Sequence, residues 1–144
     1  MNKQAWNRIR KIVDAKYKTF YKGNKCYYCG DMADTIDHAP DINKVYAWGE
    51  DRFRSRGIDL VRVSCCSECN TILGHRSPAS LQKRCEFVYR ELLKKYDKFI
   101  MMPNWYDEDC EEVTGILVDY IENSMIVKRW IERRLEYMEE LHKV

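Results

Sequence analysis

Two pairs of cysteines carry the clearest chemistry in this sequence. Cys26 and Cys29 form one Cys-x-x-Cys pair, and Cys66 and Cys69 form another after a long intervening segment. Thiolate pairs at this spacing are typical of structural zinc sites, in which four sulfur atoms surround the metal and leave no open coordination position. We therefore predict that these four cysteines bind one structural zinc ion, which joins two segments that a small core could not hold together alone.

The other three cysteines have less specific roles. Cys65 stands next to Cys66 and is an alternative fourth ligand, although the x-x spacing favours Cys66. Cys85 falls on the apolar stripe of a predicted helix, and Cys110 lies near the predicted start of another. We expect Cys85 and Cys110 to be ordinary core or surface thiols, since free cysteine behaves as a small apolar residue.

Three polar residues near the cysteine pairs suit phosphodiester hydrolysis. Asp37 and His38 stand side by side between the pairs, and Asn70 follows Cys69 directly. The reaction needs a base that takes a proton from water and a divalent cation that neutralises charge on the phosphate and the leaving oxygen. We predict that His38 is the base and Asp37 an oxygen ligand of catalytic Mg²⁺, which Mn²⁺ can replace. Asn70 is either a second oxygen ligand or a residue that orients the histidine.

Each of these residues also has a structural interpretation. His38 is alternatively a buried histidine that is hydrogen-bonded to a backbone carbonyl, and Asn70 is alternatively a helix-capping residue. On a regular strand, Asp37 and His38 would point to opposite faces of the sheet. A bend in the strand is therefore expected if both serve one site.

This order of motifs resembles a known family. Cys-x-x-Cys, then Asp-His, then Cys-x-x-Cys-Asn is similar to the zinc-stapled branch of the HNH endonucleases, also called ββα-metal or His-Me finger endonucleases, which includes phage recombination endonuclease VII. The resemblance covers about residues 26–75. It implies a strand–strand–helix core in which Asp37 and Asn70 bind Mg²⁺ and His38 activates water. It also implies that the hairpin and helix lie against the DNA minor groove.

The sequence departs from the family pattern after the second cysteine pair. Many HNH enzymes carry a third His or Asn further along the helix, where this chain has Pro78, with His75 nearby. We interpret His75 either as a replacement ligand or phosphate contact, or as a surface histidine that caps the short helix.

Basic side chains gather between the two predicted strands. They are Lys44, Arg52, Arg54 and Arg56, and Trp48 and Phe53 lie among them. Basic and aromatic side chains together suit phosphate contacts and base stacking. These four residues, with His75 and Arg76, are candidate DNA contacts; the alternative is a solvated loop whose aromatic residues pack inward.

The N-terminal segment is also basic. Residues 1–25 hold eight Lys or Arg residues against Asp14 alone. Apolar residues recur every three or four positions over residues 2–20, which predicts an amphipathic helix. Its basic side chains either contact phosphates or form a solvated helix face.

Hydrophobic periodicity and turn residues predict the remaining elements. These are strands at about 33–38 and 60–64, short helices near 43–48 and 70–73, a helix from the Ser77-Pro78 cap to about residue 95, a loop over 97–106, and helix from the Asp109/Glu112 capping box to residue 141, with an interruption near 123–124. The apolar stripe of the last helix packs either within the chain or in a homodimer.

Composition indicates a folded protein. Charged residues make up 33% and hydrophobic residues 45% of the 144 residues, which argues against disorder. No apolar run approaches the roughly 18 residues of a membrane span, and the N-terminus lacks the apolar region of a signal peptide. We therefore expect a cytoplasmic protein with no membrane partner, a location that in a phage protein would be the host cytoplasm.

Together these features predict a mostly helical α+β protein. It would comprise a basic N-terminal helix (1–25), a zinc-stapled HNH-like core (26–76) and a helical C-terminal region (77–144). The predicted function is Mg²⁺-dependent cleavage of DNA with His38 as general base. The alternative is a non-catalytic, zinc-stabilised module that binds nucleic acid or protein and is built on a degenerate HNH fold.

Overall fold

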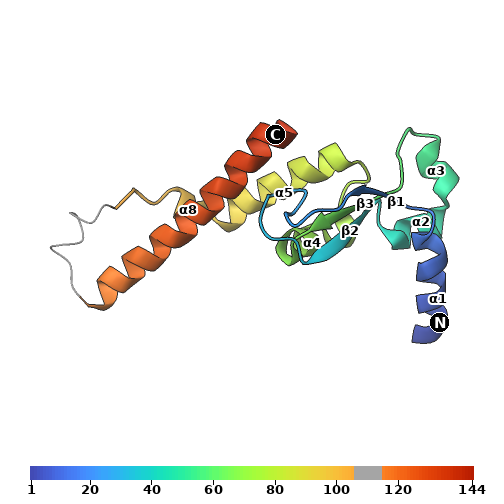
Figure 1. Cartoon of the computed structure of the whole chain (residues 1–144), viewed down its shortest axis with the longest axis horizontal. Coiled ribbons are helices and arrows are strands. Elements are labelled where there is room, and N and C mark those ends of the chain that lie inside the picture. Colours follow the sequence, from blue (N-terminus) through green and yellow to red (C-terminus); the bar gives the residue numbers. More distant parts are fainter. Residues whose placement is uncertain (106–114) are drawn as a thin grey trace. The chain divides into compact units, whose positions relative to one another are not determined.

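The computed structural model describes residues 1–105 and 115–144, and Figure 1 shows the order of the elements. The chain divides into two compact units, Met1–Val88 and Tyr89–Val144. As predicted, the fold is α+β and mostly helical, with a single three-stranded sheet among the described residues. The boundary between the units lies inside helix α5 (Leu81–Lys95), so the first unit extends beyond the predicted core.

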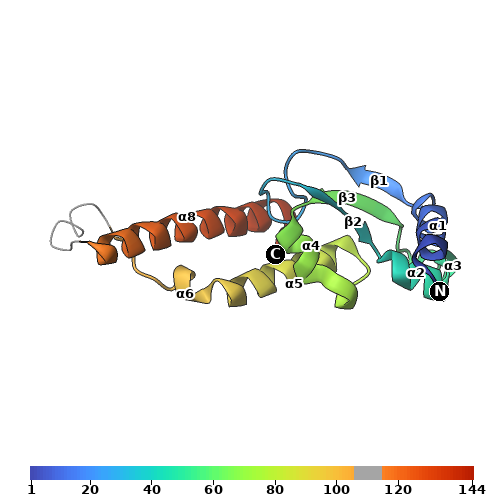
Figure 2. The ribbon, with the colours of Figure 1, turned by 90° about the horizontal axis from the view of Figure 1, so that it is seen from below.

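The sheet has the strand order β1-β3-β2 (Figure 2). β2 (Thr35–Ala39) and β3 (Val61–Cys65) are antiparallel, and both were expected from the sequence. β1 (Lys18–Tyr21) runs parallel to β3 and was not expected. Helix α4 (Ser67–Leu73) follows β3 directly and contacts β2. The predicted order of strand, strand and helix is therefore present from β2 to α4. That the protein belongs to the HNH family stays a prediction.

The N-terminal helix is shorter than predicted. α1 (Lys3–Asp14) is capped at its start by Asn2, whose side-chain oxygen accepts a hydrogen bond from the backbone amide of Ala5 at 2.8 Å. It ends at Asp14, and the prediction of helix to residue 20 is wrong because residues 18–21 form β1. The amide of Lys18 donates to Leu60 O at 2.9 Å. Pairing with a distant strand thus overrides the local helical pattern.

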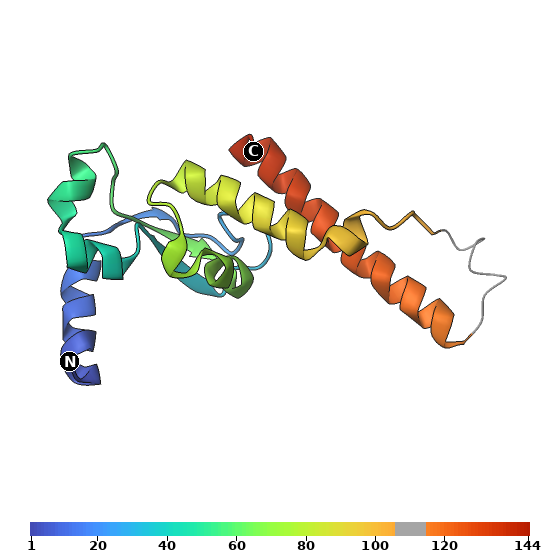
Figure 3. The same ribbon diagram turned by 180° about the vertical axis from the view of Figure 1, so that it is seen from behind.

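Two short helices occupy the connection between β2 and β3. α2 (Ile42–Trp48) was predicted, and α3 (Glu50–Arg54) was not. Viewed from behind, α1 in blue lies beside α2 in teal (Figure 3). Their buried side chains form an apolar core, which consists of Val13, Tyr17, Ile42, Val45, Phe53 and Leu60. This core holds α1 next to the end of β2.

Helix α5 begins later than predicted. The Ser77-Pro78 cap is wrong, because the helix starts at Leu81, and the Ser80 hydroxyl accepts a hydrogen bond from the amide of Lys83 at 3.3 Å. Ser77 is buried and instead accepts a hydrogen bond from Arg84.

The second unit contains α6 (Asp97–Ile100) and α8 (Ile116–His142). α6 lies where a loop was predicted, and α8 continues through 123–124 without the predicted interruption. Within this unit the rings of Tyr96 and Trp130 meet edge to face with centroids 5.4 Å apart. The predicted capping box and Cys110 lie outside the described residues. No helix in the described part of the chain has both the length and the apolar character to cross a membrane.

Candidate functional site

The two cysteine pairs meet in the first unit. The side chains of Cys26, Cys29, Cys66 and Cys69 are all buried, and their sulfur atoms lie within 4.8 Å of one another. Four sulfur atoms placed about 2.3 Å from a common tetrahedral centre would lie about 3.8 Å apart. The Cys29 and Cys66 sulfurs are 3.7 Å apart. The cluster therefore suits a structural metal such as zinc, as predicted.

Local backbone structure forms the two halves of this site. The Cys29 amide points at Cys26 Sγ at 3.5 Å, and the Cys69 amide points at Cys66 Sγ at 3.4 Å. Hydrogen bonds from the other cysteines lower the pKa of the Cys66 thiol, which favours the thiolate form that binds metals. Gly30 has φ 78°, a left-handed conformation that glycine adopts readily as the chain turns after the first pair.

The neighbouring thiols are separate from the cluster. Cys65 is fully buried in β3 and is not among the four clustered cysteines, so the alternative assignment of Cys65 as a ligand is not borne out. Cys85 is buried in α5, and burial raises the pKa of its thiol to about 12. Such thiols stay protonated and behave as apolar core groups.

Asp37 and His38 occupy opposite faces of the sheet. β2 pairs regularly with β3 through this region, with Asp37 opposite Val63 and His38 opposite Arg62. The predicted bend is therefore absent. Asp37 is 4% exposed, whereas His38 is only partly buried. The two side chains have different partners, and each partner set comes from a distant part of the chain.

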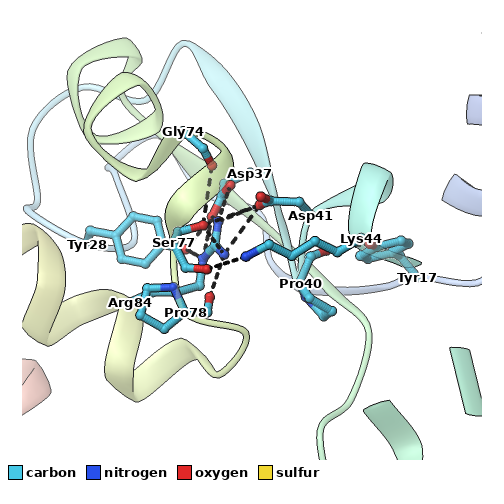
Figure 4. Close-up of polar contacts among 10 residues, drawn as sticks. All are labelled: Tyr17, Tyr28, Asp37, Pro40, Asp41, Lys44, Gly74, Ser77, Pro78 and Arg84. Carbon is cyan, nitrogen blue, oxygen red and sulfur yellow. Dashed lines mark hydrogen bonds and ion pairs between the residues drawn. The ribbon is translucent and has the colours of Figure 1, made fainter. Parts of the chain in front are cut away.

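The carboxylate of Asp37 is held by Arg84 and Tyr28 (Figure 4). Arg84 Nη2 donates to both oxygens of Asp37, at 2.8 and 2.9 Å, and Nε donates to Oδ2 at 3.2 Å. The Tyr28 hydroxyl also donates to Oδ2. Burial would lower the pKa of Arg84, but Tyr28 and Asp37 together hold it above its ordinary value. A charged arginine at 1% side-chain exposure is thus paired and hydrogen-bonded, as buried ions must be.

Arg84 also organises the chain around Asp41. Its Nη1 donates at 2.8 Å to both Ser77 Oγ and Pro78 O, and it lies 3.5 Å from Asp41 Oδ1. Burial raises the pKa of Asp41, and the nearby Arg84 offsets this only in part. The second oxygen, Asp41 Oδ2, is buried and has no hydrogen-bond partner among the described residues.

His38 is bound on the opposite face by α1. Its Nε2 lies 2.6 Å from Asp14 Oδ1, and Arg62 Nη1 lies 3.2 Å from both Asp14 oxygens. Burial would raise the pKa of Asp14, but His38 and Arg62 hold it below its ordinary value. The carboxylate is therefore ionised and accepts the hydrogen bond, so Nε2 of His38 carries the proton. In the neutral imidazole, Nδ1 is then the nitrogen with the lone pair.

One cavity brings the predicted catalytic residues together. Asp37, His38, Asp41 and Asn70 line a recess of about 270 Å³. Oxygen ligands are what Mg²⁺ prefers. Three residues that line the recess carry oxygens with spare capacity. Asp37 Oδ1 accepts only from Arg84, Asp41 Oδ2 is buried and unpartnered, and the Asn70 side chain makes no hydrogen bond within the described part. Among the described residues, only the four cysteines bring three or more Cys, His or carboxylate ligand atoms within 4.8 Å of one another.

The predicted DNA contacts of the connecting segment have different partners within the chain. Lys44 donates to Ser77 O at 2.7 Å, Arg54 pairs with Glu50 at 3.2 Å, and the Arg52 guanidinium lies 4.9 Å from the Trp48 ring centroid. Arg56 is exposed. Phe53 is buried, as the inward-packing alternative expected, whereas Trp48, which stacks on it, is 52% exposed.

The remaining two candidates lie just after α4. Arg76 is exposed at the end of a short 3₁₀ turn, Gly74–Arg76. The side chain of His75 lies outside the described residues.

Sequence reasoning missed four residues at this site. Asp14, Tyr28, Asp41 and Arg84 lie on other elements, and each reaches the Asp37–His38 dipeptide or its recess through tertiary packing. A weak signal existed for Asp14, which is the single acidic residue of a strongly basic segment. A weak signal existed for Arg84 as well, because this charged residue lies beside the apolar stripe of its helix.

Comparison with known proteins adds no family assignment. Neither family models, nor curated proteins, nor solved structures gave a match to this chain.

Proposed function

We propose that this protein is a metal-dependent DNA endonuclease of the HNH type that hydrolyses phosphodiester bonds with His38 as general base. The observation that supports this most strongly is that Asp37, His38 and Asn70 line one recess, in a unit that also holds the four-cysteine cluster. The resemblance of their sequence motifs to the HNH family points the same way.

The residues of the recess have distinct roles in this proposal. Asp14 fixes the imidazole of His38 through Nε2, so Nδ1 takes the proton from the attacking water. The water oxygen bonds to phosphorus as the ester P–O bond breaks. A divalent cation bound by the oxygens of Asp37 and Asn70 would neutralise charge on the phosphate and leaving group. The Asp14 carboxylate then stabilises the imidazolium that forms.

The second candidate function is a non-catalytic nucleic-acid-binding module. One observation favours it: the Arg84 guanidinium already places a positive charge on both oxygens of Asp37. If that ion pair excludes a metal, the recess is a structural ion-pair site and the zinc-stabilised fold serves binding alone.

Cleavage of supercoiled plasmid and of branched DNA with Mg²⁺ tests the proposal. We expect His38→Ala to lower the cleavage rate about 100-fold or more, the contribution of a general base. His142→Ala, which removes a histidine of the second unit that does not line the recess, should leave the rate unchanged. A wild-type protein that binds DNA but cuts none with Mg²⁺, Mn²⁺ or Ni²⁺ would establish the binding module instead.

The role of Asp14 as a positioning residue gives a separate prediction. We expect Asp14→Asn to lower kcat about 10- to 100-fold with little change in KM, because orienting partners of functional histidines have effects of this size. Asp59→Asn removes an exposed carboxylate that makes no ion pair in the described part and should be neutral. Equal losses in both variants, or a change in KM alone, would argue against positioning.

A further inference from the structure

A second cavity lies on the face of the sheet that carries His38. Its volume is about 450 Å³, and its walls come from α1 and from all three strands. The cavity and the recess share four lining residues, which are Arg10, Ile36, His38 and Ile42. The proposed function uses the recess and leaves this larger cavity unexplained.

The cavity is strongly basic. Arg10, Lys11 and Lys22 line it and make no ion pair within the described part of the chain. A fourth cation, Arg62, is neutralised by Asp14 at 3.2 Å. Three uncompensated positive charges around one concavity attract an anion, because low-dielectric walls focus the field.

The cavity also has an apolar and aromatic wall. Tyr21, Ile36 and Ile42 line it, and Ile36 is 55% exposed although it sits in a strand. Pockets of this size, apolar with a few polar groups, hold ligands of small-molecule dimensions. A nucleotide combines the matching parts: a flat base for the apolar wall and a phosphate for the cations.

We propose that this cavity binds one unpaired nucleotide of a DNA strand, with its phosphate near Arg10, Lys11 and Lys22 and its base against Tyr21 and Ile36. A base inside a duplex is stacked on both faces and cannot enter such a cavity unless it is extruded. That the bound nucleotide adjoins the cleaved bond rests on the proposed function, since His38 borders both cavities. Binding itself does not depend on cleavage.

Fluorescence anisotropy with a labelled oligothymidylate and a duplex of equal length, without Mg²⁺, tests this inference. We expect the wild type to prefer the single strand at least about 10-fold, and the variant R10Q/K11Q/K22Q to lose about 30-fold or more in affinity. The slope of log affinity against log salt should fall by about 0.7, since the three cations neutralise one phosphate of a single strand.

The matched control is K3Q/R8Q/K25Q. It removes the same charge from exposed positions of the same N-terminal segment that do not line the cavity. We expect less than about a 3-fold loss for this control. Equal losses in the two triple variants would overturn the proposal, because they would show diffuse attraction. Equal affinity for single strand and duplex would also overturn it.

Two further experiments test whether the nucleobase stacks on Tyr21 and whether the bound nucleotide belongs to a DNA strand. Tyr21→Leu should weaken binding of the oligonucleotide about 5- to 100-fold, the range for loss of one base–aromatic stack, with an unchanged melting temperature. Free thymidine monophosphate should not compete at micromolar concentration; if it does, the site serves a free nucleotide and the proposal fails. Normal binding by an Asn70→Ala variant that cannot cut would separate this inference from the proposed nuclease activity.

Discussion

Replacement of Cys69 by serine is expected to unfold the first unit at 25 °C. Cys69 is fully buried in the four-sulfur cluster, and serine is a poor zinc ligand. Zinc binding in small zinc modules contributes about 10–16 kcal/mol to the folded state, whereas a whole domain is stable by only about 5–15 kcal/mol. Loss of the metal therefore removes more free energy than the unit has in reserve. Removal of zinc by an excess of a strong chelator should have the same effect.

Hydrogen exchange measured by mass spectrometry gives the readout, together with zinc content per chain. Amides of residues 1–88 should lose protection in Cys69→Ser, while those of the second unit report any general effect. Cys65→Ala is the matched control, since Cys65 is equally buried but outside the cluster, and it should cost about 1 kcal/mol. A wild-type protein that contains no zinc, or a Cys69→Ser variant that stays protected, would refute the structural metal.

Arg84→Met is expected to destabilise the first unit by about 3–5 kcal/mol. The side chains of Arg84 and Asp37 are 1% and 5% exposed, so solvent screens their attraction little. Removal of one partner from a buried ion pair leaves the other charge unpaired, and losses of this size follow. Asp41 and Ser77 lose a donor at the same time. The free energy of unfolding, from denaturant titration, measures the loss.

The loss should also depend on pH. Burial already raises the pKa of Asp41 above its unfolded value in the wild type, and the nearby Arg84 offsets this in part, so removal of Arg84 raises the pKa of Asp41 further. A group with a raised folded pKa stabilises the fold when protonated, and that stability is lost as pH rises through the folded pKa. The difference between wild type and Arg84→Met should therefore be smaller at pH 5.5 than at pH 7.5.

Two variants control this experiment. Lys83→Met removes an exposed positive charge from the adjacent position of α5 and should change stability by less than about 0.5 kcal/mol. Asp37→Asn combined with Arg84→Met should be no less stable than Arg84→Met alone, because the unpaired charge is gone. Additive losses in the double variant would show that the two side chains do not interact.

These predictions assign the two faces of the hairpin to different tasks. One face holds Asp37, with Arg84 and Tyr28 beneath it. The other presents His38, Asp14 and the basic cavity. Mutation of Arg84 or Tyr28 should act mainly on stability, and mutation of His38 or of the basic cavity mainly on DNA binding and cleavage. Asp37, which pairs with Arg84 and is a proposed metal ligand, should affect both.

Local features of the sequence were sufficient for part of this structure. The four-cysteine cluster, which suits a structural metal such as zinc, follows from spacing alone, because two Cys-x-x-Cys pairs leave few other arrangements. β2, β3 and α4 follow from short-range apolar patterns and from Gly74, whose φ of 48° ends the helix. The recess with Asp37, His38 and Asn70 follows in turn, since their positions are tied to the cysteine pairs.

Tertiary structure alone decided the partners of these residues. β1 replaced the last turn of the predicted helix because its pairing with β3 joins segments far apart in sequence. Asp14 reached His38, and Arg84 reached Asp37, by packing of helices at opposite ends of the first unit. Such contacts depend on how apolar faces pack against one another, and the local pattern of residues does not specify that packing. The sequence by itself thus determined where a metal and a base could lie, whereas folding determined which charges surround them.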